Sequence, residues 1–490
     1  MRTAGVFMFL LLNMGMEISG AFLGNLLVVP MDGSPWVGFK AIAQEMGRRG
    51  HRVTVVMPET TIRMGPGKHY DTLTYPVPYD KTYIDSVMSK HKDIMKKSSQ
   101  PFMEKIKKRF TQFQAISDFL HITAEKLLFN ASELLCTQII CLLVHLGIPC
   151  HLDMKSAGCP SPPSYVPRFF TGYTDKMSFK ERLINTLVRQ PLFCRLLYWR
   201  FDQITRDFLG ENVGVAEVTS LYLNRSDFTL DFPRPLMPNI VLVGGINCNV
   251  KHPLPPDLDS WVSGQHGFVV FTLGSMVSDL PEEITSVFLE AFRQIPQKVI
   301  WRYTGKVPDN VPENVKMMKW VPQNDLLAHP GARAFITHAG SHGVFEGLCH
   351  AVPMLMVPRN GDQPDNAARM ASRGVGIVLN ILDINTETLL KGLKEVINDS
   401  RYKENVKKLS DLHNDRLSDP LELSVYWTEF VMRHKGAKHL KSALHELYWF
   451  QYFSLDVIAL LTTVVLVFVM LTAKCMKLCF RKLRRKRKQE

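Results

Sequence analysis

The second half of the chain alternates short β-rich runs with longer helical stretches. The β-rich runs combine β-branched and aromatic residues, as strands do: Phe268–Leu273, Val299–Tyr303, Ala334–Thr337 and Pro353–Val357. Strands that alternate with helices predict a parallel sheet covered on both faces, with ligands bound at the carboxyl ends of the strands. Hydrophobic residues make up 46% of the chain and charged residues 21%. These values exclude a disordered polymer and a coiled coil.

The first half opens with the same alternation. Asn25–Pro30 predicts a strand, the helix that follows ends near residues 48–50, and Arg52–Pro58 predicts a second strand. Apolar residues on one face predict a further helix, packed on a sheet, near residues 100–135. The proline-rich segment Phe232–Pro238 predicts a linker between two halves. We therefore expect two α/β units that face each other across a cleft.

The two ends of the chain predict secretion and a membrane anchor. Arg2, an apolar run and small residues predict a cleaved signal peptide over residues 1–21. Val457–Ala473 has no charged residue and predicts a transmembrane helix over residues 454–473. The tail from Lys474 has nine basic residues and one acidic residue, so it carries +8 of the net charge of +13. The positive charge therefore indicates the cytosolic flank of an anchor and not a nucleic-acid site.

These features predict a single-pass type I protein of the endoplasmic reticulum membrane, with its bulk in the lumen and its basic tail in the cytosol. Lys486 and Lys488 match the spacing of a dilysine retrieval signal, although a simple stop-transfer cluster would look the same. Three Asn-X-Ser sequons are candidate glycosylation sites: Asn130, Asn224 and Asn398.

The most informative stretch begins at a strand that ends with Thr337 and continues into a turn of small residues. The turn Gly340–Gly343 opens a helix, and such a turn offers unpaired backbone N–H groups and the positive end of the helix dipole. These groups suit a diphosphate, and His338 could donate a further hydrogen bond to it.

Other side chains of the same stretch suit the rest of a nucleotide sugar. Trp320 offers a flat face for a base, and Gln323 offers an amide edge. Glu346, one to two turns along the helix, could accept hydrogen bonds from two ribose hydroxyls. Asp362 and Gln363, beyond the next strand, suit the hydroxyls of a sugar. Each residue alone is a weak signal, but their order together is specific.

This stretch resembles the signature of the UDP-glycosyltransferases. Gly244–Cys248, Phe271–Ser278 and the single anchor are similar to those of the vertebrate UDP-glucuronosyltransferases, and the similarity runs from about residue 25 to the tail. The resemblance implies the glycosyltransferase type B fold, with two Rossmann-like domains facing a cleft and one C-terminal transmembrane helix. It implies an inverting transfer of glucuronic acid to small lipophilic acceptors, with UDP-glucuronic acid as co-substrate and no cofactor. The glucuronate donor, as opposed to the glucose donor, depends on the resemblance alone.

The resemblance also implies roles for individual residues. Trp320 would stack on uracil and Gln323 would contact the uridine, while Glu346 would bind the ribose. The remaining donor residues would be Ser275 and His338 at the phosphates, the turn residues Gly340, His342 and Gly343 as backbone donors, Arg302 in the same pocket, and Asp362 with Gln363 at the sugar. Arg359-Asn360 replaces the Leu-Phe pair common in the family and puts a charge near the sugar.

The resemblance divides the chain as follows: signal peptide 1–21, acceptor-binding domain 22–235, UDP-sugar-binding domain 236–430, connecting helix 431–453, transmembrane helix 454–473 and cytosolic tail 474–490. We expect no metal, because the apolar surroundings of the cysteine and histidine residues near 136–151 favour buried or disulfide-bonded thiols. Partners are expected to be the UDP-sugar donor, the acceptor, the membrane and other family members in homo- or hetero-oligomers, but no nucleic acid.

Two departures from the family lie in the acceptor half. The family's general base is a histidine in a Gly-Ser-His-Trp loop, and Pro35 occupies its position here. The strand and the Asp that orient this base have no counterpart, because the domain is shortened around residues 133–147. A tertiary amine could attack without a base, and His151 is a remote substitute. The catalytic residue is therefore unknown. The alternative function is a donor-binding subunit that is catalytically impaired and modulates full-length relatives.

Overall fold

The computed structural model describes residues 23–30, 32–89, 158–169, 171–187, 219–248, 251–274, 280–359 and 361–486, together with single positions between 111 and 127 and at 203 and 207. The chain divides into two compact units, residues 1–440 and 441–490, and we describe each by itself. The predicted signal peptide, Ser275, Asn130, His151 and the shortened stretch 133–147 lie outside the described residues.

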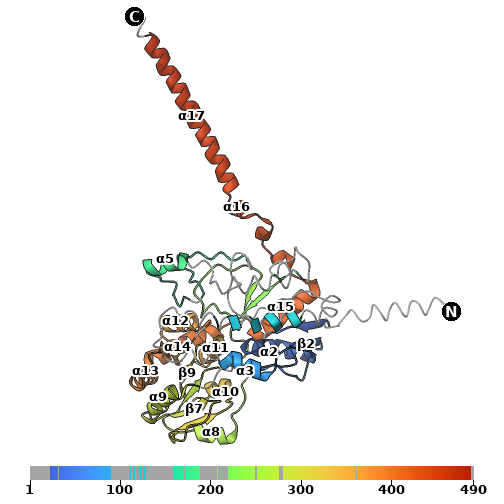
Figure 1. Cartoon of the computed structure of the whole chain (residues 1–490), viewed down its shortest axis with the longest axis vertical. Coiled ribbons are helices and arrows are strands. Elements are labelled where there is room, and N and C mark those ends of the chain that lie inside the picture. The colour runs from blue at the N-terminus through green and yellow to red at the C-terminus, as the bar shows by residue number, and fades with distance from the viewer. Residues whose placement is uncertain are drawn as a thin grey trace, which may run out of the picture. The chain divides into compact units, whose positions relative to one another are not determined.

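A six-stranded parallel sheet forms the second half of the first unit (Figure 1). Its strands are β6 (Phe268–Thr272), β7 (Lys298–Arg302), β8 (Val315–Met318), β9 (Ala332–Thr337), β10 (Met354–Met356) and β11 (Gly376–Val378). The spatial order is β11-β10-β9-β6-β7-β8, and every pair is parallel. The prediction of a parallel sheet is confirmed, and all four predicted runs form strands.

Both faces of this sheet are buried, which explains the continuous apolar runs. Val269 and Phe271 of β6 point into one core, and Phe268 and Val270 point into the other. Trp301 of β7 is fully buried and stacks on Phe271, with ring centroids 4.7 Å apart. Helices from both sides complete the two layers, so the strand ends are fixed in place by packing.

The helices of this half divide between the two cores. Those on the Phe271 side are α9 (Glu282–Arg293) and α13 (Thr386–Asn398). Those on the Phe268 side are α8 (Pro256–Val262), α10 (Gln323–Ala328), α11 (Ser341–Cys349), α12 (Gln363–Ser372) and α14 (Ser400–Asn414). Helices on both faces of one parallel sheet make this half a doubly wound α/β layer.

The first half contains two smaller parallel sheets. One consists of β1 (Asn25–Val28), β2 (Arg52–Pro58) and β3 (Asp71–Tyr75), and the other of β4 (Tyr222–Asn224) and β5 (Ile240–Leu242). Its helices are α2 (Ser34–Arg48), α3 (Lys81–Ser89) and α5 (Phe179–Leu187). The β1–α2–β2 unit confirms the predicted opening of the chain. The described positions between residues 111 and 127 are all helical, as predicted there.

One late helix returns to the first half. Helix α15 (Pro420–His434) packs against α2, and its Val425 and Val431 are buried in one core with Trp36 and Met46. Arg49, at the end of α2, pairs with Glu422 of α15. The end of the first unit therefore stabilises the beginning of the chain.

The second unit ends in the helix α17 (Leu455–Lys486). Its segment Leu455–Arg481 is the one helix in the described part of the chain that is long and apolar enough to span a membrane. The segment 431–453, expected to be one connecting helix, is not: α15 ends at His434, and two 3-10 turns, η3 (Lys438–Leu440) and η4 (Ala443–Glu446), precede the short helix α16 (Trp449–Tyr452). Lys435 and Gly436 have positive φ angles, which end α15.

Candidate functional site

The strand order places a crevice between β6 and β9. From β6 the chain continues to β7 and β8 on one side, and β9, β10 and β11 lie on the other side. In open parallel sheets, ligands bind at such a point, outside the carboxyl ends of the strands. Gly274 follows the end of β6 and His338 follows the end of β9. His338, one of the two predicted phosphate residues, therefore lies where this type of sheet binds ligands.

His338 packs tightly against two glycines of the crevice. A Cβ atom at Gly274 would lie 2.6 Å from the imidazole, and one at Gly340 would lie 2.4 Å from its Nε2. Burial, assisted by the positive charge of Arg359, lowers the pKa of His338 to about 3. Its Nδ1 is buried without a hydrogen-bond partner among the described residues. His338 is therefore a neutral imidazole with unused hydrogen-bonding capacity.

Helix α11 begins directly after this turn, with Gly340 at its N-cap and no side chain capping it. The first-turn N–H groups and the positive end of the helix dipole therefore remain for an anion. His342, in the first turn, hydrogen-bonds Arg225 from the end of β4, with 2.5 Å between Nε2 and Nη1. Gly343 is buried, and a Cβ atom there would lie 3.3 Å from Oγ1 of Thr337. Gly343 thus lets the helix approach the strand.

Glu346 and Gln323 meet in the same crevice. The amide Nε2 of Gln323 donates a hydrogen bond to Glu346, and the amide oxygen accepts one from the Thr272 hydroxyl. Burial raises the pKa of Glu346 to about 7, against the opposing effect of the Gln323 hydrogen bond and with a small addition from Asp325. A carboxyl group kept in so costly an environment, beside a polar amide, indicates a binding role.

Trp320 follows the edge strand β8 and is 61% exposed. The guanidinium carbon of Arg302 is 5.7 Å from the centroid of the indole ring. Arg302 also donates a hydrogen bond to the carbonyl of Gly274, while its Nε has no partner among the described residues. Burial lowers the pKa of Arg302, and the charge of Arg63 adds to this effect. An exposed indole beside a half-buried guanidinium suits a flat base that carries carbonyl groups.

Asp362 and Gln363 open helix α12 on the other side of the turn. Asp362 accepts a hydrogen bond from Nδ2 of Asn366 at 2.8 Å, and the same amide donates to the carbonyl of Ala339 at 3.0 Å. Oε1 of Gln363 accepts from the backbone N–H of Arg359 at 2.9 Å. Asn366 thereby ties the predicted sugar residues to the turn that holds His338.

The predicted base position lies at the start of α2. Pro35 falls in the first turn of this helix, where proline is well tolerated, and Gly33 is the N-cap. The nearby carboxylate of Asp32 accepts backbone hydrogen bonds from Gly33 at 2.6 Å, from Ile62 and from Arg63 at 3.0 Å. Asp32 therefore holds two loops together, and three of its roughly four acceptor sites are taken by backbone N–H groups.

The two described glycosylation candidates differ in burial. Asn224 is only 6% exposed, inside β4, and its Nδ2 has no hydrogen-bond partner among the described residues. Asn398 is exposed at the end of α13. An oligosaccharide is bulky and needs the surface, so Asn398 is the better acceptor in the folded chain.

Several residues at the site were not predicted from the sequence. Thr272 ends β6 and orients Gln323, and Asn366 bridges α12 to the turn. Arg225 comes from the first half and lies within a sequon, a motif that drew attention only to its asparagine. The available signal was an arginine two residues after the apolar run Leu221–Leu223, since a charge next to a buried strand needs a partner.

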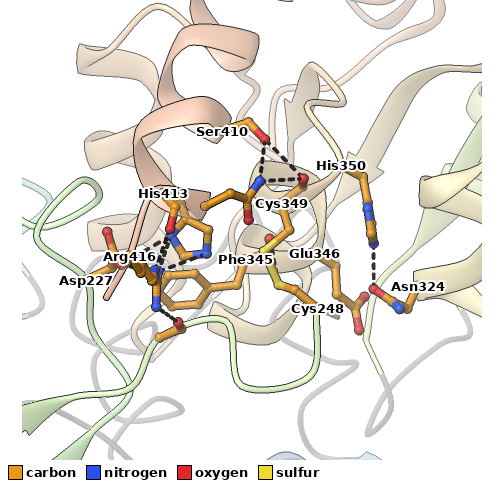
Figure 2. Close-up of a disulfide and its surroundings, with 12 residues drawn as sticks. Asp227, Cys248, Asn324, Phe345, Glu346, Cys349, His350, Ser410, His413 and Arg416 are labelled. Atoms are coloured by element: carbon orange, nitrogen blue, oxygen red, sulfur yellow. Dashed lines mark hydrogen bonds and ion pairs between the residues drawn. A yellow bond between two sulfur atoms is a disulfide. The ribbon is translucent and has the colours of Figure 1, made fainter. Parts of the chain in front are cut away.

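A disulfide anchors the C-terminal end of helix α11, as Figure 2 shows. It joins Cys248, beyond β5, to Cys349, the last residue of α11, across 101 residues of sequence. Nearby, the buried Asp227 pairs with Arg416 and with His413, whose Nδ1 is 3.1 Å from the carboxylate. In the chain-entropy description, a disulfide that closes a loop of this length contributes about 4–5 kcal/mol to stability. Helix α11 is thus held firmly behind the donor residues.

The surroundings of the disulfide form neither the donor site nor a metal site. A cavity of about 260 Å³ lies beside it, and none of the predicted donor residues lines this cavity. Cys248, Cys349 and His413 are the one group of three possible metal ligands in the described part of the chain, within 4.8 Å of one another. The two sulfurs are bonded to each other, so they do not offer the thiolates that metals bind.

Comparison with known proteins identifies the family. A family model described as "UDP-glucoronosyl and UDP-glucosyl transferase" matches residues 24–138 and 131–490. UDP-glucuronosyltransferase 1A1 of Homo sapiens is 42% identical, covering 96% of this chain and 94% of its own length. UDP-glucuronosyltransferase 1A6 of Homo sapiens is 40% identical over 98% of this chain and 95% of its own length.

The same comparisons locate a gap. The alignment with the 1A1 protein runs over 506 positions; 96% of 490 residues is about 470, so about 36 positions have no residue in this chain. The two pieces of the family match overlap at residues 131–138, next to and partly inside the stretch 133–147 that the sequence predicts to be shortened.

Solved structures agree on the fold. Os79 from O. sativa in complex with UDP has a TM-score of 0.54 at 14% identity, covering 84% of this chain and all of its own. The spinosyn forosaminyltransferase SpnP has a TM-score of 0.53 at 15% identity over 83% of this chain and 99% of its own. These likenesses confirm the glycosyltransferase type B fold. With a matching family model over nearly its whole length and relatives above 40% identity, the chain belongs to the UDP-glucuronosyl and UDP-glucosyl transferase family.

Proposed function

We propose that this chain is a UDP-glucuronosyltransferase that binds UDP-glucuronic acid at the crevice between β6 and β9. The observation that carries the proposal is the Gln323–Glu346 hydrogen bond, which brings the base-binding and ribose-binding positions together at the topological switch point. Nδ1 of His338 and Nε of Arg302 have no hydrogen-bond partner among the described residues, so they could serve the diphosphate and the base. The two human relatives are named UDP-glucuronosyltransferases, and their names support the same donor.

A cationic group beside the sugar residues favours the acid over the plain sugar. Arg225 hydrogen-bonds His342. Burial lowers the pKa of Arg225 and the charge of Asp362 opposes this, so Arg225 and Asp362 are neighbours. Arg359 is close enough to His338 to lower its pKa. A glucuronate carboxylate would find two guanidinium groups near the sugar site, and glucose would leave them without an anion.

The acceptor half supports acceptors that need no general base. Pro35 has no proton acceptor, and the carboxylate of Asp32 is held by three backbone N–H groups. A tertiary amine attacks the anomeric carbon through its lone pair, displaces UDP and has no proton to lose. A phenol must lose a proton during the same step. Without a general base, its transfer would lack the rate acceleration of about 10²–10⁴-fold that such a base contributes.

Turnover of two matched acceptors tests this proposal. With radiolabelled UDP-glucuronic acid and membranes that contain the full chain, we expect a tertiary amine to be conjugated at least 100-fold faster than a phenol of similar size. UDP-glucose serves as the comparison donor and should react more slowly. UDP binding without turnover of either acceptor would contradict the proposal and favour the impaired-subunit alternative.

Donor affinity is expected to depend on pH through Glu346. The pKa of Glu346 is about 7 without the donor. Ribose hydroxyls donate hydrogen bonds to a carboxylate, so donor binding selects the ionised form of Glu346. The affinity for UDP-glucuronic acid should therefore rise about tenfold from pH 6 to pH 8 and then level off. The donor itself is fully ionised across this range, so calorimetry at several pH values isolates Glu346. Glu346→Gln should give a flat profile, and an equally steep profile in that variant would contradict the assignment.

We further propose that the protein resides in the endoplasmic reticulum membrane as a single-pass type I protein, with Asn398 glycosylated. The spanning helix α17, the basic tail and the exposed sequon support this orientation. Assembly with other family members remains a prediction of the sequence.

A further inference from the structure

One residue of the first half reaches into the predicted base site. The guanidinium carbon of Arg63 lies 5.1 Å from the centroid of the Trp320 ring, closer than that of Arg302. Arg63 belongs to the loop between β2 and β3, whereas Trp320 belongs to the signature stretch of the second half. Burial lowers the pKa of Arg63, against the attraction of Asp32. Arginine keeps its charge in proteins, so a partly buried cation covers the indole.

The loop that carries Arg63 is fixed by several contacts. Asp32 accepts hydrogen bonds from the backbone N–H groups of Ile62 and Arg63. Met64 is 7% exposed and packs in the core of the first half, and the Thr61 hydroxyl donates to its carbonyl at 3.0 Å. Residues on both sides of Arg63 are thus held in place. The guanidinium is therefore directed at Trp320 by the architecture of the loop and not by chance at the surface.

We propose that Arg63 is a donor-site residue supplied by the first half, and that the uracil base binds between its guanidinium and the Trp320 indole. This inference rests on the proposed function. Guanidinium groups are planar and stack on π-faces, and a base presents such a face on each side. Two van der Waals contacts of about 3.5 Å each require about 7 Å between the outer layers, so the Arg63 side chain must withdraw by about 2 Å from its present 5.1 Å. A flexible arginine side chain provides this movement while its loop stays fixed.

The donor's own charge favours the same arrangement. UDP brings a diphosphate into the crevice next to the base, and Arg63 would then face an anion across a short distance in a partly buried site. The charge of Arg63 lies near Arg302 and adds to the lowering of the Arg302 pKa by burial, so the two like charges repel. Donor binding would relieve this repulsion by placing a neutral base and an anion among the two cations.

Binding of UDP and of uridine to the solubilised full chain tests the inference. Arg63→Ala is expected to weaken the binding of both ligands by about tenfold, or about 1.4 kcal/mol, because one face of the base would lose its stacking partner. Arg63→Lys should remain weak, since an ammonium group carries the charge but does not stack. Arg63→Met retains the length of the side chain and serves if the alanine variant folds poorly. Lys68→Ala, at an exposed position of the same loop, is the matched control and should bind as the wild type does.

Each alternative outcome is decisive. Affinities equal to or above those of the wild type in the Arg63 variants would mean that the guanidinium merely occupies the empty site, and would overturn the inference. So would a loss for UDP without a loss for uridine, which would assign Arg63 to the diphosphate. Trp320→Ala separates this failure from that of the proposed function. If Trp320→Ala weakens UDP and Arg63→Ala does not, only the inference fails; if neither does, the donor site itself is misplaced.

Discussion

Replacement of Glu346 by alanine is expected to weaken UDP binding about a hundredfold. The carboxylate can accept hydrogen bonds from two ribose hydroxyls, and each hydrogen bond to a charged group contributes about 1.5–3 kcal/mol. Part of this gain is offset because the carboxylate already accepts a hydrogen bond from the Gln323 amide. Isothermal titration of the solubilised full chain with UDP measures the effect directly.

The same substitution should leave folding intact. The raised pKa of Glu346 means that burial of this carboxyl group is unfavourable, so its removal should not lower the melting temperature. Glu290→Ala, on the exposed face of α9, is the control and should change neither property. A Glu346→Ala variant that melts normally and binds UDP like the wild type would contradict the donor site.

The second large effect concerns stability. Asp227→Ala is expected to destabilise the protein by about 3–5 kcal/mol, because Arg416 would remain in a half-buried site without its counter-charge. The carboxylate also accepts a hydrogen bond from the backbone N–H of Thr229 at 2.6 Å and lies 3.1 Å from His413. Thermal unfolding of the full chain should show a fall of several degrees in the melting temperature.

Two comparisons make this result specific. The double variant Asp227→Ala/Arg416→Met should recover part of the loss, since it removes both charges, whereas Asp411→Ala on the exposed face of α14 should have no effect. Burial acts to raise the pKa of Asp227, but its hydrogen bonds and the charge of Arg416 outweigh it, and the pKa lies below the ordinary value. The contribution of Asp227 should therefore be present above about pH 4 and be lost at lower pH. Additive losses in the double variant would show that the two charges act independently.

Much of the second half could be predicted from local sequence. Runs such as Phe268–Leu273 are apolar on both faces, and only a strand buried on both sides accommodates them. The turn after Thr337 was expected to open a helix, and α11 begins at Ser341. Residues spaced by strand–turn–helix units necessarily meet at one edge of a parallel sheet, which is why Gln323, His338 and Glu346 could be grouped without a structure.

The contacts between the halves could not be predicted in this way. Arg63 and Arg225 lie in segments without a chemical motif, and only the packing of the first half brings them to the donor residues. The return of α15 onto α2 depends on long-range packing of Val425 and Val431, which no local period reveals. The expected connecting helix is interrupted for a local reason instead: Gly436, with its positive φ angle, ends α15.

The bond between Cys248 and Cys349 also sets an order of events during synthesis. Cys248 leaves the ribosome 101 residues before its partner, and Trp320, Gln323, His338 and Glu346 all lie between the two. Such bonds form only in oxidising compartments, so the donor half must reach one before it is closed covalently. A product that terminates before Cys349 would present an unpaired thiol at Cys248, available for cross-linking to other chains. Premature termination within this span should therefore yield disulfide-linked aggregates and not merely an inactive fragment.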